Sequence, residues 1–206
     1  MKTYATSQEN FWAGQFGDQY TLRNNDQNLV ASNIALFSKI IGRTYGVRSC
    51  IELGSNRGLN LIALGGVIPG LKMRAVEINK SAAEECAKIP NVEVFHGSAF
   101  EFPLKENYDL AFTKGALIHI APEKLNEMYD ILYKLSRRYV LIAEYYNPSP
   151  MEAIYRGNEG KLFKRDFAGE IMERYKSLRL VDYGFAYHRD YNFAQDDITW
   201  FLMEKR

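Results

Sequence analysis

The sequence is short of the residues that build metal sites and disulfide frameworks. Its two cysteines, Cys50 and Cys86, are far apart and form no CxxC pair, and its three histidines are scattered. Without a ligand spacing such as HExxH, we expect no metal site and no disulfide framework. Low-complexity tracts, proline-rich linkers and internal repeats are also missing. Nothing therefore marks a domain boundary, and we expect one domain over residues 1–206.

Long apolar runs and an excess of one charge are missing as well. The stretch LNLIALGGVIPGL is broken by glycines and a proline, and a membrane-spanning helix needs roughly eighteen apolar residues or more. The start of the chain has no apolar signal core. A net charge of +1 gives no general reason to expect a polyanion as partner. These absences predict a cytoplasmic protein with no membrane and no nucleic-acid partner. A monomer or a homodimer is expected, and nothing in the sequence decides between them.

What the sequence does show is alternation between strand-like and helix-like segments. Apolar runs of strand length occur at 47–54, 73–79, 92–97, 108–114 and 139–146. Helical patterns lie between the first and second runs, between the second and third, and between the fourth and fifth. This alternation is typical of βαβ units with helices on both sheet faces. Two further strand-like runs, 178–190 and 197–205, have no helical pattern between them, so they should pair antiparallel. The sequence predicts an α/β fold: a doubly wound, Rossmann-like, mostly parallel seven-stranded sheet with a C-terminal antiparallel hairpin.

The expected helix boundaries follow from capping and stop signals. A helix over 58–66 should stop at its terminal glycine pair, and one over 81–89 should begin at Ser81, which has Glu84 at capping-box spacing. Asp166 is placed to cap a helix that starts at the next residue. The segment 147–165 shows no regular pattern, so we expect an irregular insert on the acceptor side of the site.

The stretch CIELGSNRGLN, residues 50–60, places a glycine loop between the first strand and the first helix of the predicted sheet. Ligands bind at that edge of a doubly wound sheet, where glycine lets the backbone approach them. The dinucleotide fingerprint GxGxxG fails here because its third glycine position is Leu59. The loop is more similar to the pattern (D/E)xGxGxG of S-adenosylmethionine-dependent methyltransferases. Only the middle glycine of that pattern is replaced here, by Asn56, and asparagine tolerates left-handed backbone angles. The loop is expected to bind S-adenosylmethionine (SAM) through Glu52, Gly54, Ser55, Asn56 and Gly58.

The ends of the next strands extend this cofactor site. Glu77 ends the second strand, where an acid can accept both ribose hydroxyls, and Ile78 follows it. Ser98 and Ala99 follow the third strand. Resemblance to SAM-dependent methyltransferases implies that this loop lies beside adenine, where Ser98 replaces the commoner aspartate. After the fourth strand we expect cofactor contacts from Lys114 and Leu117.

The strand plan and these motifs resemble class I SAM-dependent methyltransferases. The segment FWAGQFGDQYTLRN, residues 11–24, together with ELGSNRG, AVEIN and GALIHIAPE, resembles more narrowly the pseudaminic acid biosynthesis-associated methyltransferases of bacteria. The resemblance covers most of the chain. It implies methylation of a nonulosonic acid sugar of the pseudaminic or legionaminic type, of its precursor or of its nucleotide-activated form, with a nitrogen substituent as the methylated group.

The N-terminal segment, residues 1–30, is interpreted as a lid that excludes water from the cofactor. Arg23 would bind the methionine carboxylate through its planar fork, and Tyr20 would donate a hydrogen bond to the same group. Trp12 would pack over the site, where its ring suits a sulfonium cation. The alternative is an amphipathic helix that only covers an edge of the sheet.

Two residues are candidates for the chemistry itself. His119 is the candidate general base, because an unperturbed imidazole titrates near neutrality. The alternative is that His119 packs or caps beside Pro122. Tyr146 is expected near the reacting groups, although a continuing strand would turn either Tyr146 or its neighbour away. Substrate contacts are expected from Tyr145, Asn147, Tyr155, Arg156 and His188.

Two other functions compete with methyl transfer. An NAD(P)-dependent sugar reductase or epimerase would need GxGxxG and usually a Tyr-x-x-x-Lys pair in the expected helix, and both are missing. A non-catalytic cofactor-binding partner protein, for example in RNA modification, is the other alternative. The (D/N)PP(Y/F) motif for methylation of planar bases does not occur.

Overall fold

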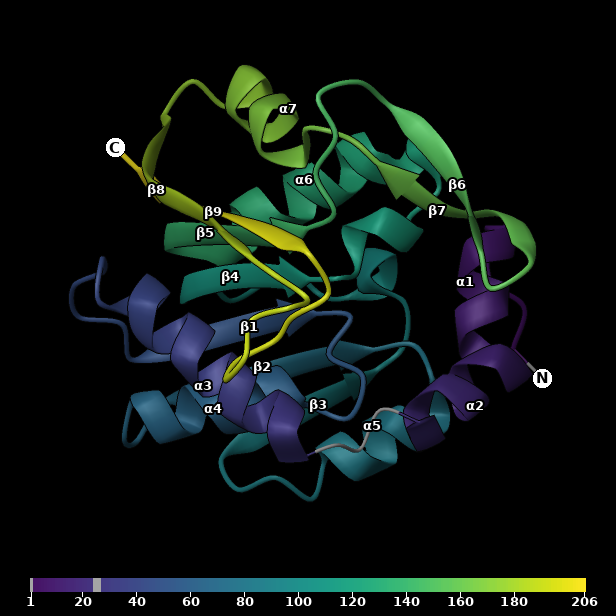
Figure 1. Cartoon of the computed structure of the whole chain (residues 1–206), viewed down its shortest axis with the longest axis horizontal. Coiled ribbons are helices and arrows are strands. Elements are labelled where there is room, and N and C mark those ends of the chain that lie inside the picture. The colour runs from purple at the N-terminus through teal and green to yellow at the C-terminus, as the bar shows by residue number, and fades with distance from the viewer. Residues whose placement is uncertain (1, 24–26) are drawn as a thin grey trace.

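A seven-stranded sheet lies at the centre of the structure, a computed structural model that describes residues 2–23 and 27–206 (Figure 1). The strand order is β3-β2-β1-β4-β5-β9-β8. The strands are β1 (Ser49–Leu53), β2 (Lys72–Glu77), β3 (Val92–His96), β4 (Tyr108–Lys114), β5 (Ser136–Glu144), β8 (Leu178–Ala186) and β9 (Ile198–Lys205). Strands β1 to β5 are parallel, and β9 pairs antiparallel with β5 and β8. The predicted doubly wound sheet with its C-terminal antiparallel hairpin is therefore confirmed.

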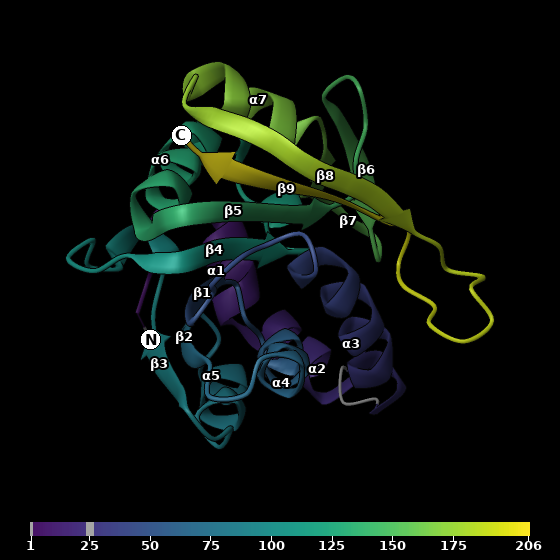
Figure 2. The ribbon, with the colours of Figure 1, turned by 90° about the vertical axis from the view of Figure 1, so that its left-hand side faces the viewer.

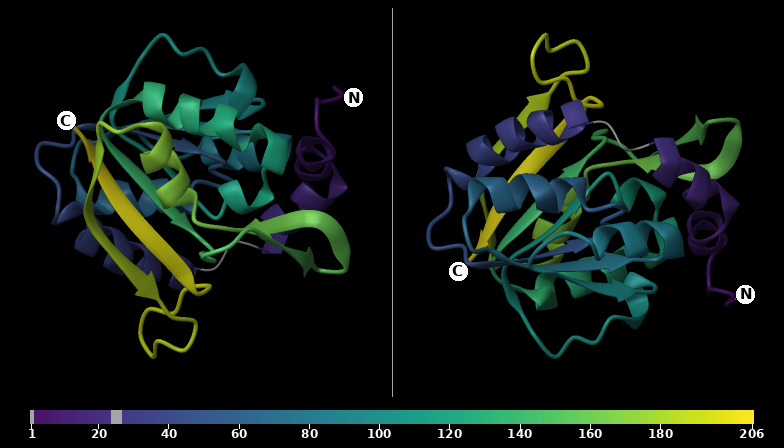
Figure 3. Two further views of the ribbon diagram at one scale, coloured as in Figure 1. Left: turned by 90° about the horizontal axis from the view of Figure 1, so that it is seen from above. Right: turned by 90° about the horizontal axis from the view of Figure 1, so that it is seen from below.

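Helices cover both faces of this sheet (Figures 2 and 3). On one face lie α6 (Leu125–Leu135) and α7 (Phe167–Arg174), and on the other lie α3 (Gln27–Ile41), α4 (Leu59–Val67) and α5 (Lys80–Cys86). Each face has its own buried apolar cluster, because alternate residues of a strand point to opposite faces. Among the described residues, no helix is both long and apolar enough to cross a bilayer.

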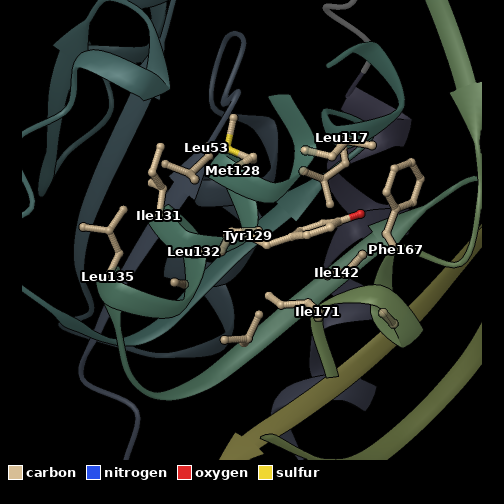
Figure 4. Close-up of a cluster of buried hydrophobic side chains, with 14 of the residues drawn as sticks. Leu53, Leu117, Met128, Tyr129, Ile131, Leu132, Leu135, Ile142, Phe167 and Ile171 are labelled. Carbon is tan, nitrogen blue, oxygen red and sulfur yellow. The ribbon is translucent and has the colours of Figure 1, made fainter. Parts of the chain in front are cut away.

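The cluster beneath α6 fixes the helix that follows β4. Tyr129 and Leu132 of α6 are almost fully buried and pack with Ile142 of β5 and Ile171 of α7 (Figure 4). Burial of apolar side chains of this size contributes roughly 1.5–3 kcal/mol each. This packing supports the loop between β4 and α6, which contains two short 3₁₀ helices, η2 (Leu117–His119) and η3 (Pro122–Lys124).

The glycine pair in the first helix does not end it. Helix α4 continues through Gly65 and Gly66 to Val67. A Cβ on Gly65 would lie 3.3 Å from Cε of Met73 on β2. This glycine therefore lets the helix pack closely on the sheet, and the predicted stop at the glycine pair is wrong.

One of the two predicted helix caps is confirmed and the other is wrong. Asn79, rather than Ser81, caps α5, since its Oδ1 accepts the N–H of Ala82 at 3.0 Å. Ser81 lies inside the helix. Asp166 caps α7 as predicted, with Oδ1 accepting the N–H of Gly169 at 2.8 Å.

The segment predicted to be irregular, 147–165, instead contains a β-hairpin of β6 (Met151–Tyr155) and β7 (Asn158–Lys164). Its turn residues, Arg156 and Gly157, have φ angles of +50° and +81°. Two left-handed positions in succession are typical of a type I′ turn, whose twist matches that of a hairpin. Arginine is unusual at the first of these positions, so no clear hairpin signal could be recognised in the sequence.

Two short helices, α1 (Ser7–Ala13) and α2 (Gln15–Arg23), lie beside this hairpin at the C-terminal edge of the parallel strands (Figure 1). Gln8 Nε2 donates to the carbonyl of Gly160 at 3.0 Å, and Lys161 Nζ donates to Ser7 Oγ at 3.0 Å.

The predicted lid segment, residues 1–30, is thus two helices followed by the start of α3. Residues 1 and 24–26 of that segment lie outside the described residues. The sequence did not indicate α3 itself, which packs on the sheet. Helices α1 and α2 together are the lid.

Candidate functional site

A cavity of about 520 Å³ lies at the C-terminal edge of β1, β2 and β4. The strand order reverses between β1 and β4, the place where α/β sheets bind ligands. The glycine loop and the ends of four strands form its floor, and the lid and the β6–β7 turn form its other walls. The edge of the sheet and the lid therefore enclose one site.

The loop after β1 is shaped by left-handed backbone positions. Gly54 and Asn56 have φ angles of +79° and +47°, so Asn56 takes the conformation expected of it. The N–H of Gly54 donates to the carbonyl of Val76 at 2.9 Å. A Cβ on Gly54 would lie 2.7 Å from Cβ of Ala116. Only glycine suits both the angle and the space, which leaves the bare backbone at the cavity wall.

Gly58 has a different role from the predicted one. It precedes α4 and does not line the cavity. A Cβ there would lie 2.4 Å from Cδ1 of Ile89 and 2.8 Å from Sγ of Cys86. Gly58 therefore allows close packing of α4 against the end of α5.

Glu77 lies at the end of β2 with its carboxylate fixed by backbone groups. Its two oxygens accept N–H bonds from Asn56 at 2.6 Å and from Asn79 at 2.7 Å. Burial raises the pKa of Glu77, and these N–H bonds oppose that rise. Each carboxylate oxygen has a further lone pair, so Glu77 can still accept two hydroxyls from the cavity.

Glu52 lies behind the loop rather than in the cavity wall. Its side chain is fully buried, and Oε1 accepts a hydrogen bond from Nδ2 of Asn60 at 2.6 Å. Oε2 has no hydrogen-bond partner among the described residues. Burial raises the pKa of Glu52 to about 8. Asn60 does line the cavity, so Glu52 positions a wall residue where the sequence predicted a direct contact.

This buried acid makes stability depend on pH. Below about pH 4.5 the carboxyl of Glu52 is protonated in both states. Between about 4.5 and about 8 the unfolded chain loses the proton and the folded chain keeps it, so the free energy of unfolding falls as pH rises. Glu52→Gln removes this dependence, and the variant should gain up to about 4 kcal/mol over the wild type between pH 5 and pH 8.

Urea unfolding of the ligand-free chain at several pH values measures this difference. Glu84→Gln, at an exposed position of α5, controls for the loss of a carboxylate. Parallel pH curves for the wild type and Glu52→Gln would mean that Glu52 is ionised in the folded chain.

The lid is held against the end of β2 by polar contacts. Asn79 Nδ2 donates to Asp18 Oδ1 at 2.9 Å and to the carbonyl of Trp12 at 3.2 Å. Ser81 Oγ donates to the same oxygen of Asp18 at 2.7 Å. A Cβ on Gly17 would lie 1.9 Å from the carbonyl oxygen of Trp12, so glycine is required for this close approach. The helices α1 and α2 are thus docked on the sheet edge.

Aromatic rings join the lid to the strand-four loop and the hairpin. The ring of Trp12 lies 4.5 Å from that of His119, 5.2 Å from Tyr20 and 6.2 Å from Tyr155, between centroids. Nε1 of Trp12 is buried and has no partner among the described residues. The aromatic wall of the cavity therefore suits a ligand that carries a cation. The unpartnered N–H of Trp12 can donate a hydrogen bond to an acceptor on the ligand.

His119, the last residue of η2, belongs to this wall. Its Nδ1 lies 2.6 Å from the carbonyl oxygen of Lys161 on β7. A carbonyl can only accept, so Nδ1 carries the hydrogen and Nε2 has a free lone pair. Burial lowers the pKa of His119 to about 4, and the hydrogen bond to the carbonyl of Lys161 opposes this fall. The imidazole is therefore neutral near pH 7 and can accept a proton at Nε2.

The loop that holds His119 is fixed from β5. Glu144 Oε1 accepts the N–H groups of Ala116 and Leu117, each at 3.0 Å. Burial raises the pKa of Glu144 to about 7, and the backbone bonds oppose the rise. Glu144 is a positioning residue for η2.

Four charged residues line another part of the cavity: Arg23 of the lid, Lys114 at the end of β4, Arg156 of the hairpin turn and Asp196 of the β8–β9 loop. None of the four forms an ion pair within 4 Å among the described residues. Burial lowers the pKa of Lys114, and the charges of Glu52 and Asp196 oppose this. Unpaired groups of both signs suit a ligand that carries both signs.

Most of the predicted site residues meet at this cavity. Those lining it are Trp12, Tyr20, Arg23, Gly54, Ser55, Asn56, Glu77, Ile78, Ser98, Ala99, Lys114, Leu117, His119, Tyr145, Tyr155 and Arg156. Glu52 and Gly58 lie behind its wall, as described above.

Three predicted residues lie elsewhere, and the structure corrects their placement. Tyr146 is 42% exposed, with its ring 5.9 Å from that of Phe201, because chain alternation turns it away from the side that Tyr145 occupies. Asn147 donates to the carbonyl of Ser149 at the surface. His188 pairs with Asp197, 2.8 Å from Nδ1 to Oδ1, at an exposed strand end.

The sequence interpretation missed Glu9, Asn60, Asn79 and Asp196, all of which line the cavity. A signal existed for Glu9, since Thr6 and Glu9 have capping-box spacing and form that box at the start of α1. Asn79 could have been recognised as a helix cap. No local pattern marks Asp196, which lies in an irregular loop.

Similarity to known proteins is found in the structure and not in the sequence. No protein-family model matches the chain, and no curated protein is similar to it in sequence. The magnesium protoporphyrin IX methyltransferase of Synechocystis PCC 6803, solved with bound SAM, is similar with a TM-score of 0.69, at 14% identity over 100% of both chains. A Burkholderia thailandensis 1,6-didemethyltoxoflavin-N1-methyltransferase, solved with 1,6-didemethyltoxoflavin and S-adenosylhomocysteine (SAH), gives 0.71 at 13% over 100% of this chain and 93% of that one.

The plantazolicin methyltransferase BpumL in complex with SAH is similar at a TM-score of 0.68, with 12% identity over 97% of this chain and 95% of that one. These likenesses extend over nearly the whole chain. The chain therefore has the fold of class I methyltransferases.

Proposed function

We propose that the chain is a SAM-dependent methyltransferase acting on a small molecule. The observation that carries this proposal is one cavity at the place where the strand order reverses. The glycine loop at Gly54, the carboxylate of Glu77 and the aromatic residues of the lid all line it. The three solved structures described above, which share this fold, contain SAM or SAH.

The residues of the cavity fit this cofactor. The bare backbone at Gly54 leaves room for a ligand against the loop, and Glu77 has lone pairs for both ribose hydroxyls. The Trp12 ring suits the sulfonium. Of the unpaired charges, Arg23 and Lys114 would bind the methionine carboxylate, and Asp196 its ammonium.

When bound, SAM supplies a methyl group activated by the positive sulfur. The chain would align the nucleophile and receive its proton. His119 would accept at Nε2 the proton that the acceptor atom releases, while the Nδ1 bond to Lys161 keeps the imidazole oriented. The lid would exclude water from the reaction.

For the acceptor we propose a nonulosonic acid of the pseudaminic or legionaminic type, its precursor or its activated form, methylated on a nitrogen substituent. The resemblance in the segment 11–24 supports this class. The guanidinium of Arg156 at the cavity has no carboxylate partner among the described residues and suits the acid group of such a sugar. Tyr145 and Tyr155 offer ring faces and hydroxyls for the sugar.

Mass spectrometry of reaction mixtures tests the proposal. The purified chain and SAM would be incubated with nonulosonic acids, free and nucleotide-activated, and with neutral hexoses. A gain of one methylene on the nonulosonic acids alone is the expected result. Methylation of neutral hexoses alone would overturn the acceptor class and leave the reaction type standing.

Arg156→Asn tests the acceptor site separately from the cofactor site. Asparagine tolerates the left-handed turn position, so the hairpin should persist. We expect the acceptor KM to rise about tenfold or more, because a charged hydrogen bond is lost, with the Kd for SAH unchanged. Arg189→Asn, at an exposed position outside the cavity, is the control. An unchanged KM would remove Arg156 from the acceptor site.

A further inference from the structure

The lid places a carboxylate at the end of β3. Glu9 of α1 is only 8% exposed and lines the cavity. Its Oε1 accepts a hydrogen bond from Ser98 Oγ at 2.5 Å, and its Oε2 accepts from the N–H and hydroxyl of Thr6 at 3.0 and 2.9 Å. The side chain is therefore held from two directions, by the lid and by the sheet.

The strand order indicates what this carboxylate faces. The loop after β1 and Glu77 at the end of β2 line successive parts of the cavity, and β3 is the next strand outward. A nucleoside with its ribose on Glu77 and its sulfur side over the β1 loop must direct its base toward β3. The cavity continues there along Gly97, Ser98, Ala99 and Phe100.

Ser98 has no hydrogen left to donate to that base. Its O–H donates to Glu9, and its oxygen accepts the N–H of Phe100 at 3.2 Å. Among the described residues, Oε1 of Glu9 accepts only the bond from Ser98, and it keeps a lone pair. Ser98 thus positions the carboxylate of Glu9, and a carboxylate is a stronger acceptor for a ligand than the remaining lone pair of a hydroxyl.

We propose that Glu9 recognises the 6-amino group of the cofactor's adenine, so that base selection comes from the lid and not from the end of β3. This inference rests on the proposed function. An amino group donates to the carboxylate, whereas the 6-oxo group of hypoxanthine presents a second acceptor that repels it. Binding of the adenine also ties α1 to the sheet, which couples cofactor affinity to closure of the lid.

Calorimetric titration with SAH and with its deaminated analogue, S-inosylhomocysteine, tests this. The wild type should bind SAH at least about tenfold more tightly, as a site with a buried polar partner rejects the mismatched group. Glu9→Gln keeps the capping box, which accepts either residue at that position. With the amide oxygen in the capping box, the NH₂ group faces the base and can only donate, so the preference for SAH should be lost or reversed.

Two further variants separate recognition from lid stability. Thr6→Ala breaks the capping box and leaves the carboxylate, so it should weaken both ligands and keep the preference for SAH. Glu101→Gln, at an ion pair with Lys2 on the surface, should change neither Kd. An unchanged ratio in Glu9→Gln would overturn the inference alone, since SAH would still bind. A wild type that binds neither ligand would overturn the proposed function as well.

Discussion

His119→Asn is expected to slow methyl transfer by about 100-fold or more, the usual loss when a general base is removed. The asparagine Nδ2 takes the place of the imidazole Nδ1 and can donate to the carbonyl of Lys161, so the loop should keep its structure. What the variant lacks is Nε2, the atom that receives the acceptor's proton. A large loss of kcat with an unchanged Kd for SAH is therefore the expected result.

Single-turnover rates and melting temperatures at pH 7.5 measure this. At that pH the imidazole is neutral in both the folded and the unfolded chain, so the comparison is free of protonation effects on stability. In the wild type, the neutral form of His119 is lost only as pH falls toward about 4. A wild-type rate in a stable His119→Asn variant would leave His119 with a packing role only.

Gly54→Ala should raise the Kd for SAH by about tenfold to a hundredfold. The added Cβ would lie 2.7 Å from the Cβ of Ala116, and neither atom is the end of a flexible side chain. The loop backbone must therefore shift at the cavity wall. The left-handed angle of +79° adds roughly 1–2 kcal/mol of strain for a residue with a side chain.

Gly70→Ala is the matched control for this prediction. Gly70 has a φ angle of +75°, and a Cβ there would meet nothing within 4 Å. This variant should lose similar stability through backbone strain and keep the wild-type Kd for SAH in calorimetry. Equal Kd values for Gly54→Ala and the wild type would mean that the loop does not contact the ligand.

The parts of the site that are local in sequence could be predicted. Strand-length runs ending in polar residues placed Gly54, Glu77 and Lys114 at one sheet edge, because parallel strands end together. The aromatic residues of segment 11–24 indicated a lid, and Trp12 and Tyr20 do line the cavity. Their roles toward a cofactor are still predictions.

The parts that depend on distant contacts could not be predicted. Glu9 reaches Ser98 across 89 positions of sequence, and no local pattern connects them. The β6–β7 hairpin depends on an arginine in a left-handed turn position. Asp196 reaches the cavity only because of the course of the β8–β9 loop. Gly58 belongs to a cofactor pattern in the sequence, yet it serves helix packing. Spacing identifies the residue types of a site, and tertiary packing decides which of them face the ligand.

The most direct test of the central proposal is the melting temperature of the full chain with SAM, SAH, NAD(H) or NADP(H). A ligand that binds only the folded chain raises the melting temperature, and the rise grows with the logarithm of its concentration divided by its Kd. SAM and SAH should each raise it, and the nicotinamide cofactors should leave it unchanged. Stabilisation by a nicotinamide cofactor, with none by SAM or SAH, would contradict the proposed function and favour a reductase or epimerase.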